Sequence, residues 1–332
     1  MRIEFKPAVR SPIALTIGIV GPTGAGKTLS SIRMAHGLCG GARFAFGSTE
    51  GKKETLYARD YGFDRFTVDP PFKPSVFADV ILAAESAGYP LVVIDSGSKM
   101  QEGRGGMLDW HDDEMQRLDR GRGKPEKHSF SAWAAPKADM QRLIDVLESK
   151  TIHVIFALKA GDKSSQEKED PEDQRSKTVI VPKRTMSGFV GMIPTAPKEL
   201  PYELFPAFVL YPDAPGVPTP TKVQYDLRPL LRWDAPIDEE FGATIRRWNL
   251  EPPRITPAIV DAIRDAAAGD EATRKDLESR VIVALNAGAN ESAIIRKIRA
   301  TKPAAEFACP ECGQPSGACD ANCSLQSAIP PA

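Results

Sequence analysis

The chain has 332 residues, with 43 lysines and arginines against 44 aspartates and glutamates and a formal net charge of −1. This balance excludes a bulk electrostatic attraction to nucleic acid, so any DNA binding must use a local basic patch. Apolar residues make up 42% of the chain, no apolar run approaches the roughly 20 residues of a membrane span, and the start lacks the apolar core of a signal peptide, so we expect a globular cytoplasmic protein without membrane segments.

A glycine-rich motif lies between a predicted strand and a predicted helix. Residues 13 to 20 form an apolar, β-rich run typical of a buried parallel strand, and apolar positions recur at helical spacing over residues 29 to 38. Between them stands Gly21-Pro22-Thr23-Gly24-Ala25-Gly26-Lys27-Thr28. The glycines let backbone N–H groups surround a phosphate, Lys27 would reach the β- and γ-phosphates, and Thr28 would hold Mg²⁺. The pattern predicts an ATP-binding phosphate loop rather than a chance glycine-rich turn.

Two further predicted strands are followed by carboxylates. Residues 90 to 96 contain a short apolar strand ending at Asp95, and residues 44 to 50 contain another that ends at Glu50. Asp95 would lie beside the phosphate loop and hold Mg²⁺ through water. Glu50 is the candidate base that orients and deprotonates the attacking water of a hydrolase, and the alternative is a solvated loop carboxylate.

Residues 44 to 99 resemble the core of RecA-type recombinases in the order and spacing of three segments. These are Ser48-Thr49-Glu50, Leu56-Tyr57-Ala58-Arg59-Asp60-Tyr61-Gly62-Phe63-Asp64 and Val92-Val93-Ile94-Asp95-Ser96. In that family the carboxylate that matches Glu50 is the catalytic base.

Residues 5 to 212 are also similar to phage-encoded RecA-like ATPases, usually called AAA-family ATPases and similar to the Sak group of single-strand annealing recombinases. This similarity is carried by the region around Trp133 and by Phe5-Lys6-Pro7-Ala8, Asp95-Ser96 and Gly105-Gly106-Met107-Leu108-Asp109. It implies a homo-oligomer with ATP at subunit interfaces, located in the host cytoplasm, that acts on single-stranded DNA, with a phage or host single-strand-binding protein as a further partner.

The chain departs from the family pattern at two places. The segment before the base usually reads Asp-Thr-Glu, whereas here Ser48 takes the first position, which changes the hydrogen bonds behind Glu50. Residues 151 to 158 predict a strand that is followed by Lys159, where RecA carries a glutamine that senses the γ-phosphate. Lys159 is therefore either a phosphate sensor that acts by charge or an ordinary surface lysine.

A basic, glycine-rich segment follows the Asp95 strand. We expect residues 97 to 131 to form a long irregular loop, with candidate DNA contacts at Arg117, Arg120, Arg122 and Lys124. In RecA-like proteins the matching segment touches DNA, and Phe130 or Trp133 would stack on a base. Acidic residues in the segment offset much of its charge, so a solvated loop is the alternative. We expect His111 to be exposed and His153 to lie in the core.

The next segments alternate between polar and β-rich composition. Residues 160 to 177 are polar and rich in acids, which predicts a mobile loop that becomes ordered on a ligand. Short β segments at 178–181, 189–190, 208–211 and 222–225, interrupted by prolines, predict an antiparallel extension of the core sheet.

The C-terminal part predicts helices and then a cysteine-rich tail. Thr256 and Pro257 suit a helix N-cap and first turn, and helical spacing follows. Two closely spaced pairs predict Zn²⁺ bound by four thiolates, and a disordered tail with free thiols is the alternative; the pairs are Cys309 with Cys312 and Cys319 with Cys323.

The sequence thus predicts an α/β fold with a RecA-like P-loop core, a mostly parallel sheet, antiparallel edge strands, a small C-terminal helical appendage and a Cys₄ tail. The expected parts are 1–232 as the ATPase domain, 233–255 as a linker with one short helix, 256–302 as the helical region and 303–332 as the tail. The expected function is hydrolysis of ATP with Mg²⁺ in DNA recombination, repair or replication. The alternative is a nucleotide-dependent switch or loader with slow ATPase.

Overall fold

The computed structural model describes residues 10–162, 164–168, 178–250, 256–286 and 289–300 of the chain. The chain divides into two compact units. The larger unit spans residues 13 to 249, and the described helices of the smaller unit lie within residues 256 to 300.

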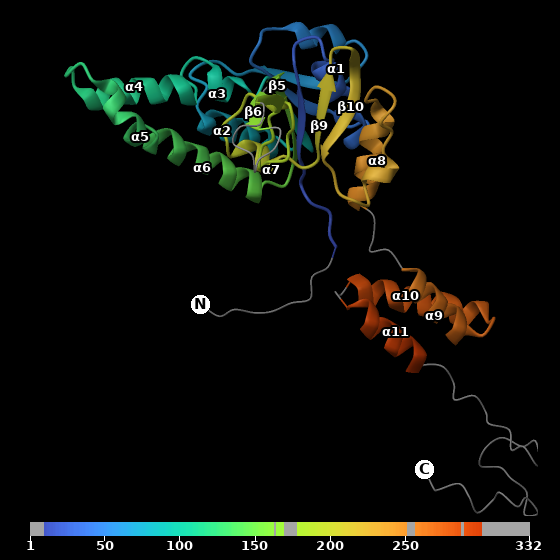
Figure 1. The fold of residues 1–332 in the computed structure, drawn as a ribbon. Helices are drawn as coiled ribbons and strands as arrows, with labels where there is room; N and C mark the ends of the chain where they lie inside the picture. The colour runs from blue at the N-terminus through green and yellow to red at the C-terminus, as the bar shows by residue number, and fades with distance from the viewer. Residues whose placement is uncertain (1–9, 163, 169–177, 251–255, 287–288, 301–332) are drawn as a thin grey trace, which may run out of the picture. The chain divides into compact units, whose positions relative to one another are not determined.

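An eight-stranded sheet forms the centre of the larger unit, in the order β10-β9-β1-β5-β4-β2-β3 with β8 beside the end of β5 (Figure 1). Its mutually parallel strands are β1 (Thr16–Gly21), β2 (Phe44–Ser48), β3 (Phe63–Thr67), β4 (Leu91–Asp95), β5 (His153–Asp162) and β9 (Ala207–Tyr211). Its antiparallel strands are β8 (Met192–Pro194) and β10 (Ala214–Lys222). The expected α/β class with a mostly parallel sheet is confirmed.

Helices cover both faces of this sheet. The helices of this part of the chain are α1 (Lys27–Leu38), α2 (Pro74–Ser86), α3 (Lys99–Glu102), α4 (Met107–Asp119), α5 (Ser129–Ala132), α6 (Ala134–Ser149), α7 (Leu200–Glu203) and α8 (Glu239–Leu250), with the short 3₁₀ helices η1 (Lys53–Tyr57), η2 (Pro125–His128) and η3 (Arg228–Leu230). Along β4, Val92 and Ile94 pack in one core with residues of α2 and α6, and Leu91 and Val93 pack in a second core with residues of α1 and α8. This alternation is what a strand buried on both faces requires.

Helix α8 closes the second core, which differs from the linker expected over residues 233 to 255. A Cβ atom on Gly242 would lie 2.1 Å from the carbonyl oxygen of Met34, and one on Gly37 would lie 1.8 Å from that of Glu239, so the backbones of α1 and α8 touch. The apolar face of this segment is buried in the core through Ile237, Phe241, Ile245 and Trp248. Residues 233 to 249 therefore belong to the larger unit, because their apolar side chains complete the core on this face of the sheet.

The proline-rich region after β8 adds one parallel and one antiparallel strand to the sheet. β9 lies parallel to β1, whereas the sequence predicted only antiparallel additions. The strand expected at residues 222 to 225 lies earlier in the chain, as β10, and contains Pro215, Pro218 and Pro220. Among the described residues, β10 is at the edge of the sheet and pairs with β9 alone, so its prolines cost few ladder hydrogen bonds. The segment expected at residues 189 to 190 makes an isolated bridge rather than a strand.

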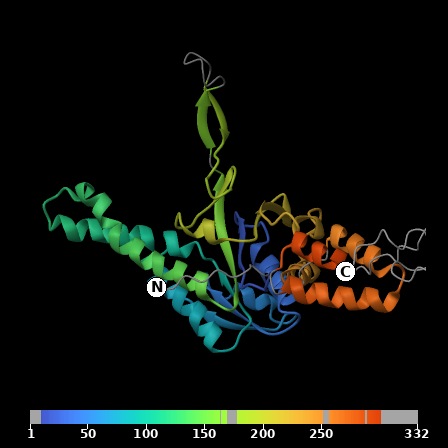
Figure 2. The same ribbon diagram turned by 90° about the horizontal axis from the view of Figure 1, so that it is seen from below.

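Residues 97 to 131 are largely helical, which corrects the expected irregular loop. α4 runs out from the core, and η2, α5 and α6 return, so that residues 107 to 149 form a helical arm (Figures 1 and 2). The Asp119 side chain, 3% exposed, orders the turn at the tip by accepting hydrogen bonds from the N–H groups of Gly123 (2.7 Å) and Lys124 (3.1 Å). His111 is buried, not exposed as expected, because its ring stacks on Trp133 with 4.3 Å between centroids.

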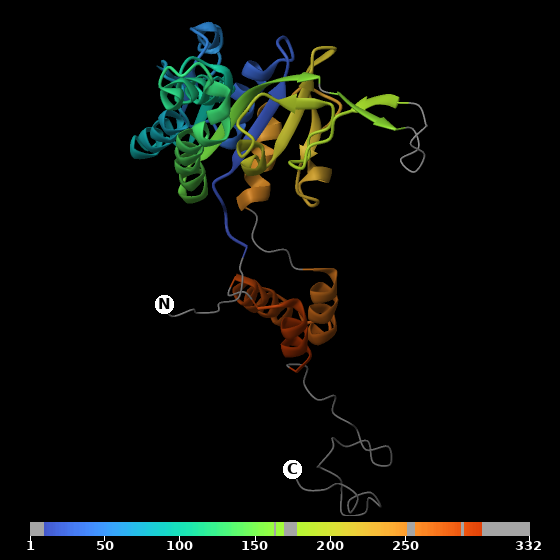
Figure 3. The same cartoon turned by 60° about the vertical axis from the view of Figure 1, so that its left-hand side comes forward.

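A two-stranded ribbon follows β5. β6 (Ser164–Lys168) pairs antiparallel with β7 (Thr178–Pro182) in a sheet of its own, which stands apart from the central sheet (Figures 2 and 3). The expected strand at residues 178 to 181 is confirmed. Because its backbone pairs with that of β6, part of the segment expected to be a polar loop forms a strand instead. Residues 169 to 177 of that loop lie outside the described residues.

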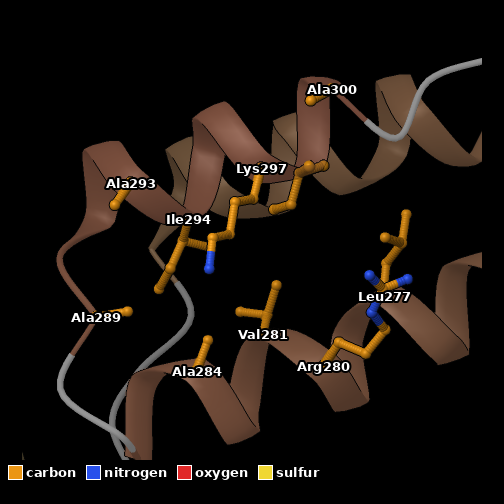
Figure 4. A pocket seen from close by; sticks show the side chains of 10 residues that line it. Leu277, Arg280, Val281, Ala284, Ala289, Ala293, Ile294, Lys297 and Ala300 are labelled. Carbon is orange, nitrogen blue, oxygen red and sulfur yellow. The ribbon is translucent and has the colours of Figure 1, made fainter.

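The smaller unit contains α9 (Pro257–Ala267), α10 (Glu271–Asn286) and α11 (Glu291–Ala300) around its own apolar core. The expected helix start is confirmed, since the Thr256 hydroxyl accepts a hydrogen bond from the N–H of Ile259 at 3.3 Å. Between α10 and α11 lies a hollow of about 360 Å³, walled by small and branched side chains such as Ala284, Ala289 and Ile294 (Figure 4).

Candidate nucleotide-binding and catalytic site

The phosphate loop joins the end of β1 to the start of α1. Gly24 and Gly26 have φ angles of 84° and 85°, in the left-handed region that side chains disfavour. A Cβ atom on Gly26 would also lie 2.9 Å from the backbone nitrogen of Gly216. The loop can therefore bring its N–H groups to the N-terminus of α1, where the helix dipole favours a phosphate. The Lys27 ammonium donates to the Pro22 carbonyl oxygen at 2.8 Å.

Thr28 and Asp95 form the candidate magnesium site. The Thr28 hydroxyl donates to a carboxylate oxygen of Asp95 at 2.6 Å, so the first turn of α1 and the end of β4 meet. Burial raises the pKa of Asp95 above its usual range, against the hydrogen bond from Thr28 and the charge of Lys27. A hydroxyl and a buried carboxylate side by side fit a hard divalent cation, whose charge would stabilise the ionised acid. These two residues would hold Mg²⁺, which would supply positive charge beside the phosphates.

Glu50 lies just after β2, the strand next to β4. Because Ser48 and Asp95 are register partners at the carboxyl ends of these parallel strands, Glu50 lies at the same edge of the sheet. Its carboxylate accepts an ion-paired hydrogen bond from the Lys159 ammonium at 2.7 Å. Burial works to raise the pKa of Glu50, but this hydrogen bond and the charges of Lys159, Lys99 and Lys27 hold it below its usual range. Glu50 is therefore ionised at neutral pH, as a base must be.

Ser48 stands where the RecA-like pattern has an aspartate, and hydrogen bonds near it connect the strand ends around Glu50. The Ser48 hydroxyl accepts a hydrogen bond from the N–H of Glu50 at 3.4 Å. The Thr49 hydroxyl accepts from the N–H of Ser96 at 2.9 Å and donates to the carbonyl oxygen of the same residue at 3.1 Å, which ties the ends of β2 and β4 together. On β5, the N–H of Lys159 donates to the Ser98 hydroxyl at 2.8 Å.

One cavity of about 390 Å³ brings these groups together. Its walls are Thr23, Gly24, Gly26, Lys27, Thr28, Leu29, Glu50, Lys53, Tyr57, Asp95, Ser96 and Lys159. Sequence reasoning missed Lys53 and Tyr57, which come from η1. Their position directly after Glu50 was a usable signal, because a segment that follows such a strand returns over the same edge of the sheet.

The candidate DNA contacts lie elsewhere, at the tip of the helical arm. Arg117 is on the last turn of α4, and its guanidinium pairs with Glu114 at 2.7 Å. Arg120, Arg122 and Lys124 follow in the turn toward η2. Of the two candidate stacking side chains, Phe130 is 93% exposed, whereas Trp133 packs against the core and against His111. Of these two side chains, Phe130 is thus the one available to a base.

The segment that carries this geometry matches a protein family described as AAA domain, over residues 13–193, more than half of the chain. The chain belongs to the AAA domain family. The match runs from just before β1 into β8, so this AAA domain includes the phosphate loop, Glu50, Asp95, Lys159 and the arm. The protein accordingly carries a nucleotide-binding P-loop domain of the AAA ATPase type. No curated protein matches the chain in sequence.

Two further findings concern the rest of this AAA-domain protein. Over the described ranges, none of the helices has the length and apolarity needed to cross a bilayer. In the same part of the chain, no group of three or more His, Cys, Asp or Glu side chains is arranged to hold a metal ion. The candidate Zn²⁺ ligands Cys309, Cys312, Cys319 and Cys323 lie outside the described residues.

Proposed function

We propose that this AAA-domain protein hydrolyses ATP to ADP and phosphate with Mg²⁺, and that it acts on single-stranded DNA in recombination, repair or replication. One observation carries the enzymatic part. The hydrogen-bonded pair of Thr28 and Asp95 and the ionised carboxylate of Glu50 line the same cavity at the phosphate loop. The resemblance to phage-encoded RecA-like ATPases supports the DNA part.

The proposed mechanism assigns each side chain a task at a stated atom. Lys27 exchanges the Pro22 carbonyl for oxygens of the β- and γ-phosphates, and Tyr57 offers an aromatic face to the base of the nucleotide. Thr28 and Asp95 would hold Mg²⁺, which would supply positive charge to stabilise the phosphates. Glu50 orients a water molecule and takes its proton as the water oxygen bonds to the γ-phosphorus and the bond to the β–γ bridging oxygen breaks.

The helical arm supports contact with a nucleic acid backbone. Within the described residues, Arg120, Arg122 and Lys124 make no ion pair with an acid, so their charges are available to phosphates. Phe130 adds an exposed ring on the same arm, suited to stacking on an unpaired base.

We extend the proposal to a homo-oligomer with ATP between subunits. The side chains of Glu50 and Lys159 are 39% and 33% exposed, so the γ-phosphate side of the cavity is open to solvent. A second copy that covers this side would exclude water from the reacting groups. Sedimentation of the protein with and without a non-hydrolysable ATP analogue tests this, and a monomer under both conditions contradicts it.

A nucleotide-dependent switch with slow turnover is the second candidate. It is favoured by the Glu50–Lys159 ion pair of 2.7 Å, which occupies an oxygen of the base. In this case ATP binding times an assembly and DNA does not accelerate hydrolysis.

The ATPase rate with and without single-stranded DNA tests the proposal and separates these candidates. We expect measurable release of phosphate that rises with DNA, and no release from Lys27→Ala, which lacks the phosphate contact. Hydrolysis by Lys27→Ala at the wild-type rate would reject the site. Turnover that DNA leaves unchanged would favour the switch.

We also propose that the cysteine-rich tail binds one Zn²⁺ through Cys309, Cys312, Cys319 and Cys323. Four thiolates in two closely spaced pairs suit the tetrahedral geometry of a structural zinc site. Metal analysis of protein purified under reducing conditions should find about one equivalent of zinc. Loss of the metal in the Cys312→Ser, Cys319→Ser variant supports the site, and wild-type protein free of zinc contradicts it.

A further inference from the structure

Lys159 lies between two carboxylates. Its ammonium is 2.7 Å from a carboxylate oxygen of Glu50 and 3.6 Å from one of Glu102. The hydrogen bond and charge of Glu50, with the charge of Glu102, hold the pKa of Lys159 above its usual range despite partial burial. The Lys159 ammonium thus interacts with two carboxylates, and the nearer one, Glu50, is the candidate base.

The position of Glu102 is set by the junction between α3 and the helical arm. The N–H of Glu102 donates to the Ser98 carbonyl at 3.1 Å, and the N–H of Gly103 donates to that of Lys99 at 2.8 Å. A Cβ atom on Gly103 or Gly106 would lie 2.6 Å or 2.7 Å from the carbonyl oxygen of Lys99, so the backbone at this junction is packed too closely for a side chain.

We propose that Glu102 is a positioning residue for hydrolysis, which draws Lys159 away from Glu50 and so frees the base to hold the attacking water. The proposal rests on the function proposed above, in which Glu50 is the base. The two acids compete for the same ammonium, and the difference between the two distances favours Glu50 in this conformation. A closer approach of Glu102 to Lys159 would shift this balance away from Glu50.

If Glu102 positions Lys159, its removal should lower kcat without weakening ATP binding, which a purely structural role does not predict. Without the charge of Glu102, Lys159 stays on Glu50, so kcat falls. ATP binding is not weakened, because Glu102 is absent from the walls of the cavity and its removal takes away a negative charge near the phosphates. The effect also requires Lys159 and is screened by salt, since the three side chains are each about a third exposed.

The experiment measures kcat and the KM for ATP of the full-length protein at low and high salt. We expect Glu102→Gln to lower kcat about threefold at low salt, the size expected for an exposed ion pair, without raising KM. The loss should shrink at high salt and vanish when Glu102→Gln is made in a Lys159→Met background. The matched control is Glu148→Gln, which removes the same charge from an exposed position on α6.

Each result is decisive. A wild-type protein without turnover rejects the proposed function itself. With turnover present, an unchanged kcat in Glu102→Gln overturns this inference alone. A loss that is insensitive to salt also overturns it, because it assigns Glu102 a structural role. The salt comparison needs only the single variant and so remains informative if Lys159→Met has no measurable activity.

Discussion

Burial and ion pairing act on the charged residues of the nucleotide cavity in opposite directions. Burial lowers the pKa of Lys27, against the nearby charges of Asp95 and Glu50, and burial raises the pKa of Asp95. Both shifts favour the neutral forms, so this pair is held in a poorly solvated environment. A triphosphate beside Lys27 and a cation beside Asp95 would each favour the charged form. Glu50 differs, because its lysine neighbours outweigh its burial.

Glu50→Gln should separate ATP binding from hydrolysis. The amide keeps the size of the side chain and can still accept a hydrogen bond from Lys159, but it cannot take a proton from water. We expect kcat to fall by roughly 10²-fold or more. Affinity for a non-hydrolysable, fluorescent ATP analogue should remain near that of the wild type, as Lys27, Thr28 and Asp95 are intact. Normal turnover by this variant would assign the base to another residue, with Asp95 the next to be tested.

His153 should make the stability of the larger unit depend on pH. Its Nδ1 accepts a hydrogen bond from the N–H of Leu15 at 3.0 Å, which requires that nitrogen to be unprotonated. Burial, with the charge of Lys150, lowers the pKa of His153 to about 4. The unfolded chain, with a pKa of about 6.5, binds the proton first as pH falls. The free energy of unfolding should therefore drop by about 3 kcal/mol between pH 6.5 and pH 4 from this residue alone.

Urea unfolding followed by tryptophan fluorescence measures this effect, because Trp110, Trp133, Trp233 and Trp248 all lie in the larger unit. In His153→Gln the decline over this pH range should be smaller by the same amount. An equally steep decline in the variant would show that other groups cause the pH dependence.

At the scale of elements, the helical arm carries basic side chains at its tip, and within the described residues Arg120, Arg122 and Lys124 make no ion pair with an acid. The buried side chain of Asp119 caps the backbone of the turn, so it does not neutralise the arginines around it. Arg117 is different, since Glu114 lies 2.7 Å from its guanidinium. The arginines at the tip are thus not equivalent, although the sequence places them together.

Replacing Arg120 and Arg122 together by alanine should weaken binding of single-stranded DNA and reduce its dependence on salt. Each lost phosphate contact should lower the slope of log affinity against log salt by about 0.7. Arg117→Ala should have a smaller effect, because its charge is already paired. Fluorescence anisotropy with a labelled oligonucleotide at several salt concentrations measures both quantities.

The control for this series is Arg142→Ala on α6, which removes a surface arginine that pairs with Asp79. It should leave DNA affinity unchanged. If the double variant at the tip keeps the wild-type salt slope, the DNA site lies on another element or the protein acts as a switch.

At the scale of the whole molecule, the boundary of the ATPase unit decides which truncations fold. A chain ending at residue 250 keeps α8 and should bind nucleotide normally. A chain ending at residue 232 loses four buried apolar side chains of α8 and the segment before it, each worth about 1.5 to 3 kcal/mol. The sum approaches the whole stability of a typical domain, about 5 to 15 kcal/mol, so the shorter chain should be unfolded or aggregated.

Circular dichroism and nucleotide binding of the two truncated chains test this boundary. A folded, nucleotide-binding chain that ends at residue 232 would show that α8 is dispensable and would support the linker expected from sequence.

The sequence by itself determined the features that are local along the chain. The phosphate loop between a strand and a helix, the acids that end two apolar strands and the helix cap at Thr256 were all predicted, because each depends on neighbouring residues and on backbone rules. The mostly parallel sheet was predicted for the same reason. Strands that alternate with helices leave few other arrangements.

Only the tertiary structure decided the features that depend on residues far apart in the chain. The helical arm was mistaken for a loop, because its glycines and charges gave no sign that His111 would be buried against Trp133. α8 was mistaken for part of a linker, because its role depends on a glycine contact with α1. The pairing of Lys159 with both Glu50 and Glu102 arises for the same physical reason. Side chains from separate strands and helices meet only when the sheet brings their ends to one edge, and no pattern within a single segment encodes that meeting.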